Sequence, residues 1–338
     1  MELSMNSCKV LGFGSPILDL LVQVDDSFLS RNISGEKGGM GMLDAEAQKK
    51  LIGSFPDGKV QKAIGGSAFN TISALTSLGM ATSFLGKIGR DANGEFYRNS
   101  YSAAHGDASR FRVSTDEPTA TCVSLVTPDS ERTMRTHLGA SSTLSADEIS
   151  EADFDGITHF HAEGYMLFLP GVLRKTMQLA KDRGCTVSFD LSSFEVVRLF
   201  REEIADLMDR YVDVIFANED EAREFCGREN FDPETAAGEL RKRCPVAAVK
   251  LGKKGALLQR DGETCRIAPK SVHAVDTTGA GDLWQAGFLY GWLNGLDLRK
   301  AGEMGSVLGA EIVQIIGAAL PPERWPEIQK QFNQIKEY

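Results

Sequence analysis

The chain has 338 residues with 34 glycines, 11 prolines and 6 cysteines, and its formal net charge is −10. Glycine is enriched while proline is not, which excludes a collagen-like or low-complexity chain and indicates backbone that approaches a ligand closely or adopts positive φ. The acidic balance argues against nucleic acid or an anionic membrane as a partner, and the longest apolar runs are too short to span a bilayer. The cysteines and histidines lack metal-binding spacing, and residues 1–8 lack the layout of a signal peptide, so we expect a cytoplasmic protein with reduced thiols.

The N-terminal half begins with β-rich segments and then alternates. Residues 8–14 predict a short buried strand that ends at a glycine turn, and residues 17–24 predict a second strand. A glycine-rich stretch at 35–41 precedes a helix at 44–52, for which Asp44 is the expected N-cap. After it we expect helices at 67–78 and 93–104, strands at 81–86, 119–126, 132–138 and 157–161, and a turn at 127–130.

The C-terminal half continues the alternation. We expect strands at 186–190, 212–217, 246–250, 256–259 and 265–267, and helices at 172–183, 219–226, 280–294, 298–316 and 322–335. Gly184 and Gly227 are placed to end two of these helices. This pattern predicts one α/β domain over residues 1–338, with a mostly parallel sheet between helices. Two stretches, roughly 17–42 and 119–138, are β-rich without intervening helices, and we expect them to form a small lid sheet.

One strand-to-helix turn, residues 275–284, carries the strongest chemical signal. Gly279, Ala280 and Gly281 are small, so their N–H groups can point into one concavity at the start of a helix, where an anion is favoured. Asp282 follows at once, and a carboxylate aimed at a phosphate is useful when it accepts a proton from an attacking hydroxyl. Taken alone, such a turn could equally be a tight connection between a strand and a helix.

The whole stretch, continued by residues 286–288, is similar to the C-terminal signature of the ribokinase-like (PfkB) carbohydrate and nucleoside kinases. Residues 63–70 resemble the N-terminal signature of the same family, although Ile72 stands where a small residue is usual. The resemblance covers residues 10 to about 320. It implies a three-layer α/β sandwich with a β-rich lid, and an enzyme that uses ATP and Mg²⁺ to phosphorylate a primary hydroxyl of a sugar or nucleoside.

The resemblance also implies roles for individual residues. Asp282 would be the catalytic base, and the amides of Gly279, Ala280 and Gly281 together with Arg132 would stabilise the transferred phosphate. Substrate hydroxyls would be bound by four further residues and by Asp282 itself: Asp19, Gly65, Gly66 and Asn70.

A second group of residues is expected on the nucleotide side. Asn218 and Glu221 match the NxxE motif, in which Glu221 would order Mg²⁺ through water, although the same residues also read as a helix N-cap with acids in its first turn. The loop after the strand at 246–250 matches the nucleotide-side loop, with Lys250, Gly252 and Gly255, whereas Lys253 and Lys254 read as a solvated pair. Thr278 would contact the nucleotide, and the backbone at Asp276 and Thr278 would hold a monovalent cation such as K⁺.

The acceptor stays open. Residues 12–19, 131–134 and 217–221 look closest to adenosine-kinase-like members, but Ser15 replaces the asparagine usual there, so ribose, fructose and related sugars remain candidates. His137 and Phe168 could line the acceptor pocket, with core or lid packing as the simpler account. A nicotinamide-dependent oxidoreductase is supported only by Gly12 and Gly14, and a silent binding-only relative is disfavoured by the intact signature. We expect a monomer or a homodimer.

Overall fold

The computed structural model describes residues 8–34, 37–56, 58–129, 131–227 and 232–337. Within these ranges the body is a nine-stranded sheet in the order β14-β13-β12-β11-β10-β9-β1-β5-β6. The strands are parallel from β12 to β6, and β13 and β14 add an antiparallel hairpin. Their bounds are β1 Lys9–Phe13, β5 Ala81–Gly89, β6 Phe111–Ser114, β9 His159–Glu163, β10 Thr186–Asp190, β11 Val214–Asn218, β12 Val246–Lys250, β13 Ala256–Arg260 and β14 Glu263–Ile267.

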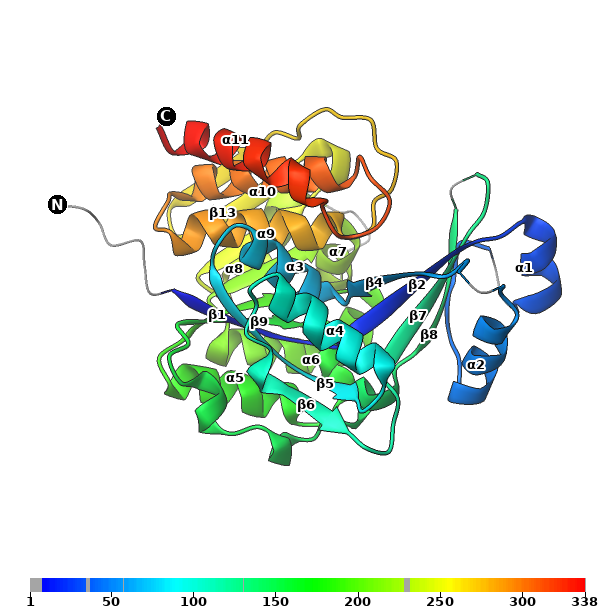
Figure 1. Ribbon diagram of the computed structural model, residues 1–338. Helices are drawn as coiled ribbons and strands as arrows, with labels where there is room; N and C mark the ends of the chain where they lie inside the picture. The colour runs from blue at the N-terminus through cyan, green and yellow to red at the C-terminus, as the bar shows by residue number, and fades with distance from the viewer. Residues whose placement is uncertain (1–7, 35–36, 57, 130, 228–231, 338) are drawn as a thin grey trace.

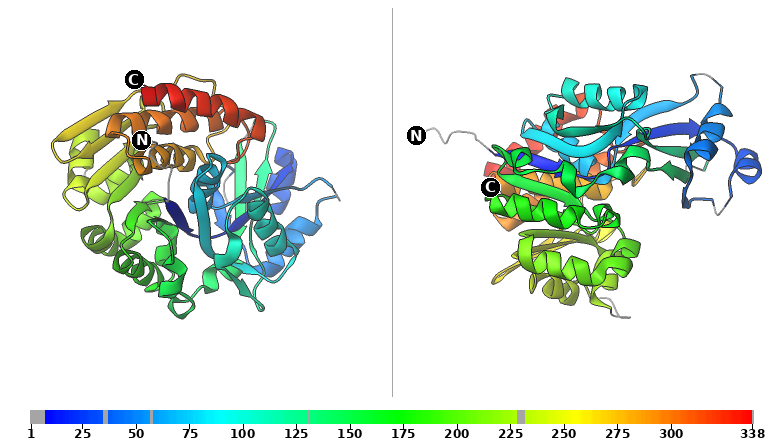
Figure 2. Two further views of the ribbon diagram at one scale, coloured as in Figure 1. Left: turned by 60° about the vertical axis from the view of Figure 1, so that its left-hand side comes forward. Right: turned by 90° about the horizontal axis from the view of Figure 1, so that it is seen from below.

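Helices cover both faces of this sheet (Figures 1 and 2). Buried residues of β11 alternate between the two helix layers: Val214 and Phe216 pack into one core, and Ile215 and Ala217 into the other. Such strands are apolar on both faces, as a parallel sheet requires. Over the described ranges, none of the helices is long and apolar enough to cross a bilayer. One layer contains α3 Ser67–Ser77, α4 Ala92–Ala103, α9 Ala280–Leu293, α10 Leu298–Ile312 and α11 Trp325–Glu337, and the other α5 Val172–Asp182, α6 Phe194–Tyr211, α7 Glu219–Cys226 and α8 Pro233–Arg241.

A smaller five-stranded sheet projects from one side of the body, with two short helices beside it (Figure 1). Its order is β3-β8-β7-β2-β4, and it uses strands from both β-rich stretches that the sequence indicates. The bounds are β2 Ile17–Gln23, β3 Met40–Met42, β4 Gln61–Gly65, β7 Ala120–Val126 and β8 Arg132–His137, with α1 Asp26–Asn32 and α2 Ala45–Gly53. The predicted α/β class with a second, smaller sheet is therefore confirmed.

Some local predictions are wrong. The stretch 17–42 contains a helix, α1, because the Asp25 carboxylate accepts a hydrogen bond from the Phe28 N–H at 2.7 Å and so caps its first turn. The helix expected to reach residue 316 ends at Ile312, and α6, α8, β4 and β6 were not predicted. Residues 35, 36 and 130 of the predicted glycine-rich stretch and turn lie outside the described ranges, as do residues 1–7 and 338 of the predicted domain.

Candidate active site

Polar side chains gather where neighbouring parallel strands of the body end. The last residues of β9, β10, β11 and β12 are Glu163, Asp190, Asn218 and Lys250, and these strands lie next to one another in the sheet. Carboxyl ends of parallel strands meet at one edge of a sheet, which is where ligands bind in open α/β folds. The first turn of α9 lies beside this edge, because a Cβ atom on Gly281 would stand only 3.1 Å from the Lys250 Nζ.

Asp282 occupies the first turn of α9. Gly279 is the N-cap of this helix and has φ of +73°, a left-handed conformation that favours glycine. The Asp282 carboxylate is held by two side chains from the start of α3: Ser67 Oγ donates to Oδ1 at 2.9 Å, and Asn70 Nδ2 donates to Oδ2 at 2.8 Å. Thr71 Oγ1 donates to the Asp282 carbonyl at 3.0 Å. The base predicted from the sequence thus has a fixed orientation beside the amides of the turn.

The surroundings also tune the acidity of Asp282. Burial raises its pKa to about 6, the hydrogen bond from Asn70 and the charge of Lys250 oppose this rise, and the negative charge of Asp190 adds to it. A carboxyl with this pKa is mostly ionised at neutral pH and is still basic enough to accept a proton from a hydroxyl group.

Lys250 is the cation among several carboxylates. Its Nζ lies 3.3 Å from Asp190 Oδ1, and the exposed fractions of the two side chains are 14% and 6%. Burial disfavours the charge of Lys250, but Asp190, Glu221 and Asp282 together keep its pKa above the ordinary value. The ammonium group therefore stays charged next to the first turn of α9.

Asn218 and Glu221 form a capping box at the start of α7. Asn218 N and Nδ2 donate to the two carboxylate oxygens of Glu221 at 2.8 and 2.6 Å, and Glu221 N donates to Asn218 Oδ1 at 2.9 Å. Burial and the charge of Asp190 raise the pKa of Glu221 to about 7. The N-cap expected from the sequence is thus present.

The residues fit Mg²⁺ in one manner only. Both oxygens of Glu221 already accept hydrogen bonds, so a contact through ordered water suits them better than direct coordination. Among the described residues, no group of three or more histidine, cysteine, aspartate or glutamate side chains is arranged to hold a metal. A Mg²⁺ ion that is bound mainly by phosphate oxygens and water needs few protein ligands.

The smaller sheet contributes Asp19. This residue lies on β2, between Ala63 of β4 and Cys122 of β7, and a Cβ atom on Gly65 would overlap its carboxylate. Gly66 has φ of +108°, and a Cβ atom there would collide with a backbone carbonyl. Burial raises the pKa of Asp19 to about 6, and the charge of Arg132 opposes this.

Arg132 connects the smaller sheet to the turn before α9. Its Nη1 donates to Thr278 Oγ1 at 2.9 Å, and its Nη2 lies 2.7 Å from Asp276 Oδ2. The Asp276 carboxylate also accepts from Thr278 N at 3.0 Å and from Gly317 N at 2.8 Å. The arginine predicted to face the phosphate thus lies against the signature turn.

The two glycines predicted in the loop after β12 lie in different surroundings. Gly252 has φ of +54° and open space where a side chain would lie, whereas Gly255 has φ of +91° and no room for a Cβ atom beside the Ile267 carbonyl. Gly255 is thus required by the β12–β13 hairpin itself. His137 and Phe168 have packing partners: His137 Nδ1 lies 3.1 Å from the Leu43 carbonyl, and the Phe168 ring packs edge-on against Phe200.

Sequence reasoning missed three residues of this cluster: Ser67, Glu163 and Asp190. Glu163 is buried, and its carboxylate accepts from Ser15 N at 2.9 Å and from Ala68 N at 2.7 Å. Burial raises its pKa to about 7, and the backbone amides oppose the rise. The available signal was position, since Asp190 is the last residue of a predicted strand and Glu163 follows another by two residues.

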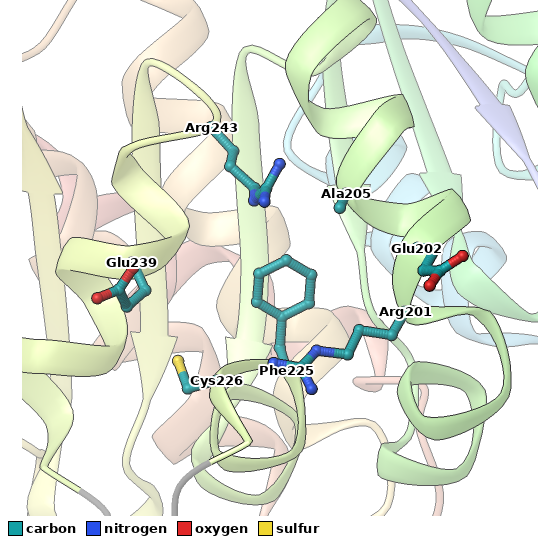
Figure 3. A pocket seen from close by; sticks show the side chains of 7 residues that line it. All are labelled: Arg201, Glu202, Ala205, Phe225, Cys226, Glu239 and Arg243. Atoms are coloured by element: carbon teal, nitrogen blue, oxygen red, sulfur yellow. The ribbon is translucent and has the colours of Figure 1, made fainter.

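A separate surface cavity of about 430 Å³ lies among α6, α7 and α8 (Figure 3). None of its lining residues belongs to the strand-end cluster, and these three helices cover the face of the sheet opposite to α9. The cavity is therefore distinct from the candidate active site. Its lining residues are Arg201, Glu202, Ala205, Phe225, Cys226, Glu239 and Arg243.

A buried carboxylate held in the first turn of a helix, on a mostly parallel sheet with a smaller sheet beside it, is the arrangement expected of a phosphotransferase with the ribokinase-like fold. The chain belongs to the pfkB family of carbohydrate kinases, whose family model matches residues 44–325. This confirms the family predicted from the two signatures, and the family implies ATP and typically Mg²⁺.

Individual relatives agree with this membership. Adenosine kinase of Dictyostelium discoideum is 26% identical over 345 residues, covering 96% of this chain and 100% of the relative. ATP-dependent ribose-1-phosphate kinase of Halopiger xanaduensis is 30% identical, over 76% of this chain and 83% of its own. The crystal structure of adenosine kinase from Sinorhizobium meliloti is 30% identical and has a TM-score of 0.84, covering 96% of this chain and 99% of its own. The chain is therefore an ATP-dependent kinase of the class that phosphorylates hydroxyl groups of sugars and nucleosides.

Proposed function

We propose that the protein transfers the γ-phosphoryl group of ATP to the primary hydroxyl of a ribonucleoside, with adenosine or another ribose-containing molecule as the acceptor. The observation that carries the proposal is the fixed position of Asp282 between the start of α3 and the anion-binding turn of α9. The names of two relatives, both adenosine kinases, support a nucleoside as the acceptor.

Asp282 acts as the base in the proposed reaction. It accepts the proton of the acceptor hydroxyl, whose oxygen forms a bond to the γ-phosphorus while the bond from that phosphorus to the β,γ-bridging oxygen breaks. ADP leaves with the electron pair of the broken bond. The amides of Gly279, Ala280 and Gly281 donate to the oxygens on which negative charge spreads. Glu221, assisted by Asn218, would hold the water ligands of a Mg²⁺ ion bound with ATP, and this ion would offset part of the phosphate charge.

The remaining predicted residues complete the proposed site. Asp19 accepts hydrogen bonds from two sugar hydroxyls, and Gly65 and Gly66 keep that approach free of side chains, beside Asn70. On the nucleotide side, Lys250, Gly252, Gly255 and Thr278 line the loops that receive ATP. The smaller sheet acts as a lid that excludes water, and Arg132 would exchange its contact with Asp276 for the transferred phosphate.

We also propose that K⁺ binds through backbone carbonyls at Asp276 and Thr278. The Asp276 carboxylate is committed to two backbone amides and to Arg132, so carbonyl oxygens are the remaining ligands in this turn.

A free sugar or sugar phosphate is the second candidate acceptor. Ser15 favours it, because Ser15 replaces the asparagine that adenosine kinases usually carry. Among the described residues, its Oγ has only the weak acceptor Met166 Sδ, at 3.9 Å, as a side-chain partner. A panel of nucleosides, ribose, fructose and ribose phosphates, assayed by ADP release, separates the two. Turnover of free sugars at higher kcat/KM than any nucleoside would replace the first candidate with the second.

The Asp282→Asn variant tests the mechanism. We expect turnover to fall by about 10³-fold or more, because the amide cannot accept the proton, while the fold and the affinity for ATP stay close to wild type. Stopped assays of phosphorylated acceptor, with an ATP analogue titrated in parallel, measure both. Near-normal turnover in this variant would remove Asp282 from the role of base.

A further inference from the structure

We propose that Lys250 is a further catalytic residue, whose ammonium group contacts the phosphoryl group in transfer. This deepens the proposed function, on which it rests. The family resemblance assigns Lys250 only to the loop on the nucleotide side. The geometry points instead to the anion-binding turn, because the Nζ atom stands 3.1 Å from the position that a Cβ atom of Gly281 would take.

Lys250 has hydrogen-bond donors that its protein partner does not use. An ammonium group has three N–H donors. In the part of the chain that the structure describes, the one hydrogen-bond acceptor of Nζ is Asp190 Oδ1, at the long distance of 3.3 Å. The side chain is only 14% exposed, so water cannot freely serve the other donors. A buried cation with spare donors at the edge of an anion-binding turn is arranged to meet an anionic ligand.

The positive charge of Lys250 lies among negative charges. Lys250 contacts Asp190, and the negative charges of Glu221 and Asp282 also act on it, so three carboxylates favour this one cation. Without Lys250 these carboxylates would repel a triphosphate that approaches the turn. A fixed cation at this position offsets their repulsion and stabilises the negative charge that spreads over the phosphoryl oxygens during transfer.

The backbone around Asp190 helps to position the Lys250 cation. Asp190 ends β10 and is followed closely by Ser192, which adopts φ of +68° although it is not glycine. Ser192 Oγ accepts from Gly164 N at 2.7 Å and donates to the Asp190 carbonyl at 3.3 Å. Strained backbone of this kind persists where surrounding contacts over-determine it. Here the contacts fix the backbone of Asp190, whose carboxylate holds Lys250.

Two measurements on Lys250→Met test the inference. In turnover assays with the acceptor that wild type prefers, we expect kcat to fall by about 10²-fold and the KM for the acceptor to change less than threefold. In calorimetric titrations with Mg²⁺ present, we expect the affinity for ADP with aluminium fluoride, which mimics the phosphoryl group in transfer, to fall at least tenfold. Affinity for ADP alone should stay within twofold.

Lys253→Met is the matched control, because Lys253 is an exposed lysine three residues further along the same loop. We expect it to leave kcat, the KM for the acceptor and both affinities unchanged. Lys250→Arg keeps the charge, and we expect it to restore part of the affinity for ADP with aluminium fluoride. Thermal melts check the fold, and if Lys250→Met does not fold, Lys250→Arg and Lys250→Gln carry the comparison.

A purely structural role would appear differently. If Lys250 only neutralises Asp190, the double variant Lys250→Met/Asp190→Asn should recover the wild-type affinity for ADP with aluminium fluoride, and that result overturns the inference. Unchanged affinity in Lys250→Met overturns it as well. Because this titration needs no acceptor, a wild-type protein that phosphorylates none of the panel would contradict the proposed function while leaving the inference on Lys250 decidable.

Discussion

Glu163 illustrates how one buried carboxylate can order two loops of a site. Its two oxygens accept from the amides of Ser15 and Ala68, which lie before β2 and in the first turn of α3. Asp19 is carried by β2, and the side chains that orient Asp282 come from the start of α3. Glu163 therefore helps to position the segments that carry the proposed substrate-binding carboxylate and the side chains that hold the proposed base.

We expect Glu163→Ala to destabilise the protein and raise the KM for the acceptor. The substitution leaves the buried amide of Ala68 and the partly buried amide of Ser15 without an acceptor, and each such group costs about 1–3 kcal/mol. The free energy of unfolding, measured by urea denaturation, should fall by about 2–5 kcal/mol. Glu163→Gln retains one carbonyl oxygen and should lose less, and the exposed Glu202→Ala is the control. An alanine variant as stable as wild type would show that the two amides find other partners.

At the residue scale, the sequence predicts those site residues that lie within one continuous motif. Gly279, Gly281 and Asp282 could be located because a glycine-rich turn next to a helix start has its own signature. Asp190 and Glu163 could not, because a carboxylate at the end of a strand resembles any other until the sheet order places β9, β10 and β12 side by side. That order depends on contacts between residues far apart in the chain.

At the scale of elements, caps located α7 but were not sufficient elsewhere, since the missed helices α6 and α8 also have side-chain N-caps, Ser193 and Asp232. The helix at 219–226 was predicted with its observed bounds because Asn218 and Gly227 mark its two ends. α6 was missed, although it is the longer helix. Its first half is rich in valine and phenylalanine and fits a strand equally well, and packing of Val197, Ile204 and Leu207 against the sheet selects the helix.

Glycines in two elements should respond oppositely to alanine. Gly281 is helical, and its added Cβ atom would approach the flexible end of the Lys250 side chain, with Nζ nearest at 3.1 Å, so Gly281→Ala should keep wild-type stability while turnover falls at least tenfold. Gly255 has φ of +91° and no room for a Cβ atom, so Gly255→Ala should lose about 2 kcal/mol or more of stability. Thermal melts together with ADP-release assays measure both effects.

Gly295→Ala provides the control for this comparison. Gly295 has φ of +77° but open space around it, so the backbone penalty alone applies, about 1 kcal/mol. If Gly281→Ala unfolded as readily as Gly255→Ala, the role of Gly281 would be structural.

At the scale of the whole molecule, the site depends on both sheets. The body supplies the proposed base, the proposed anion-binding turn and Lys250, whereas the smaller sheet supplies Asp19 and Arg132. The contacts from Arg132 to Asp276 and Thr278 join the two parts next to the start of α9. Movement of the smaller sheet would therefore change the charge around the phosphate as well as the access of water.

Buried charges around the site also shape the pH dependence of the whole fold. Asp19 and Asp282 have pKa values raised to about 6, and Glu163 and Glu221 to about 7, in each case first by burial. A carboxyl whose pKa is higher in the folded state binds protons more readily there than in the unfolded chain. These four groups therefore stabilise the fold as the pH falls from 8 toward 5.

Two buried histidines act in the opposite direction. Burial lowers the pKa of His159 and of His161 to about 3. As the pH falls below about 6.5, these histidines bind protons in the unfolded chain but stay neutral in the folded one, which destabilises the fold. Between pH 8 and pH 5.5 the four carboxyls stabilise the fold by more than the two histidines destabilise it. The reason is that Glu163 and Glu221 begin to bind protons already near pH 7.

We therefore expect stability and activity to favour different pH values. The melting temperature should be roughly 2–5 °C higher at pH 5.5 than at pH 8. Turnover requires ionised Asp282, so kcat/KM should fall about tenfold per pH unit below about 6. Calorimetric scans and initial rates across this range measure both, with Glu163→Gln as the variant in which the stability change should shrink. A melting temperature that rises steadily from pH 5.5 to 8 would mean that the site carboxyls are ionised in the native protein without penalty. Burial would then not raise the pKa of Asp282 as proposed.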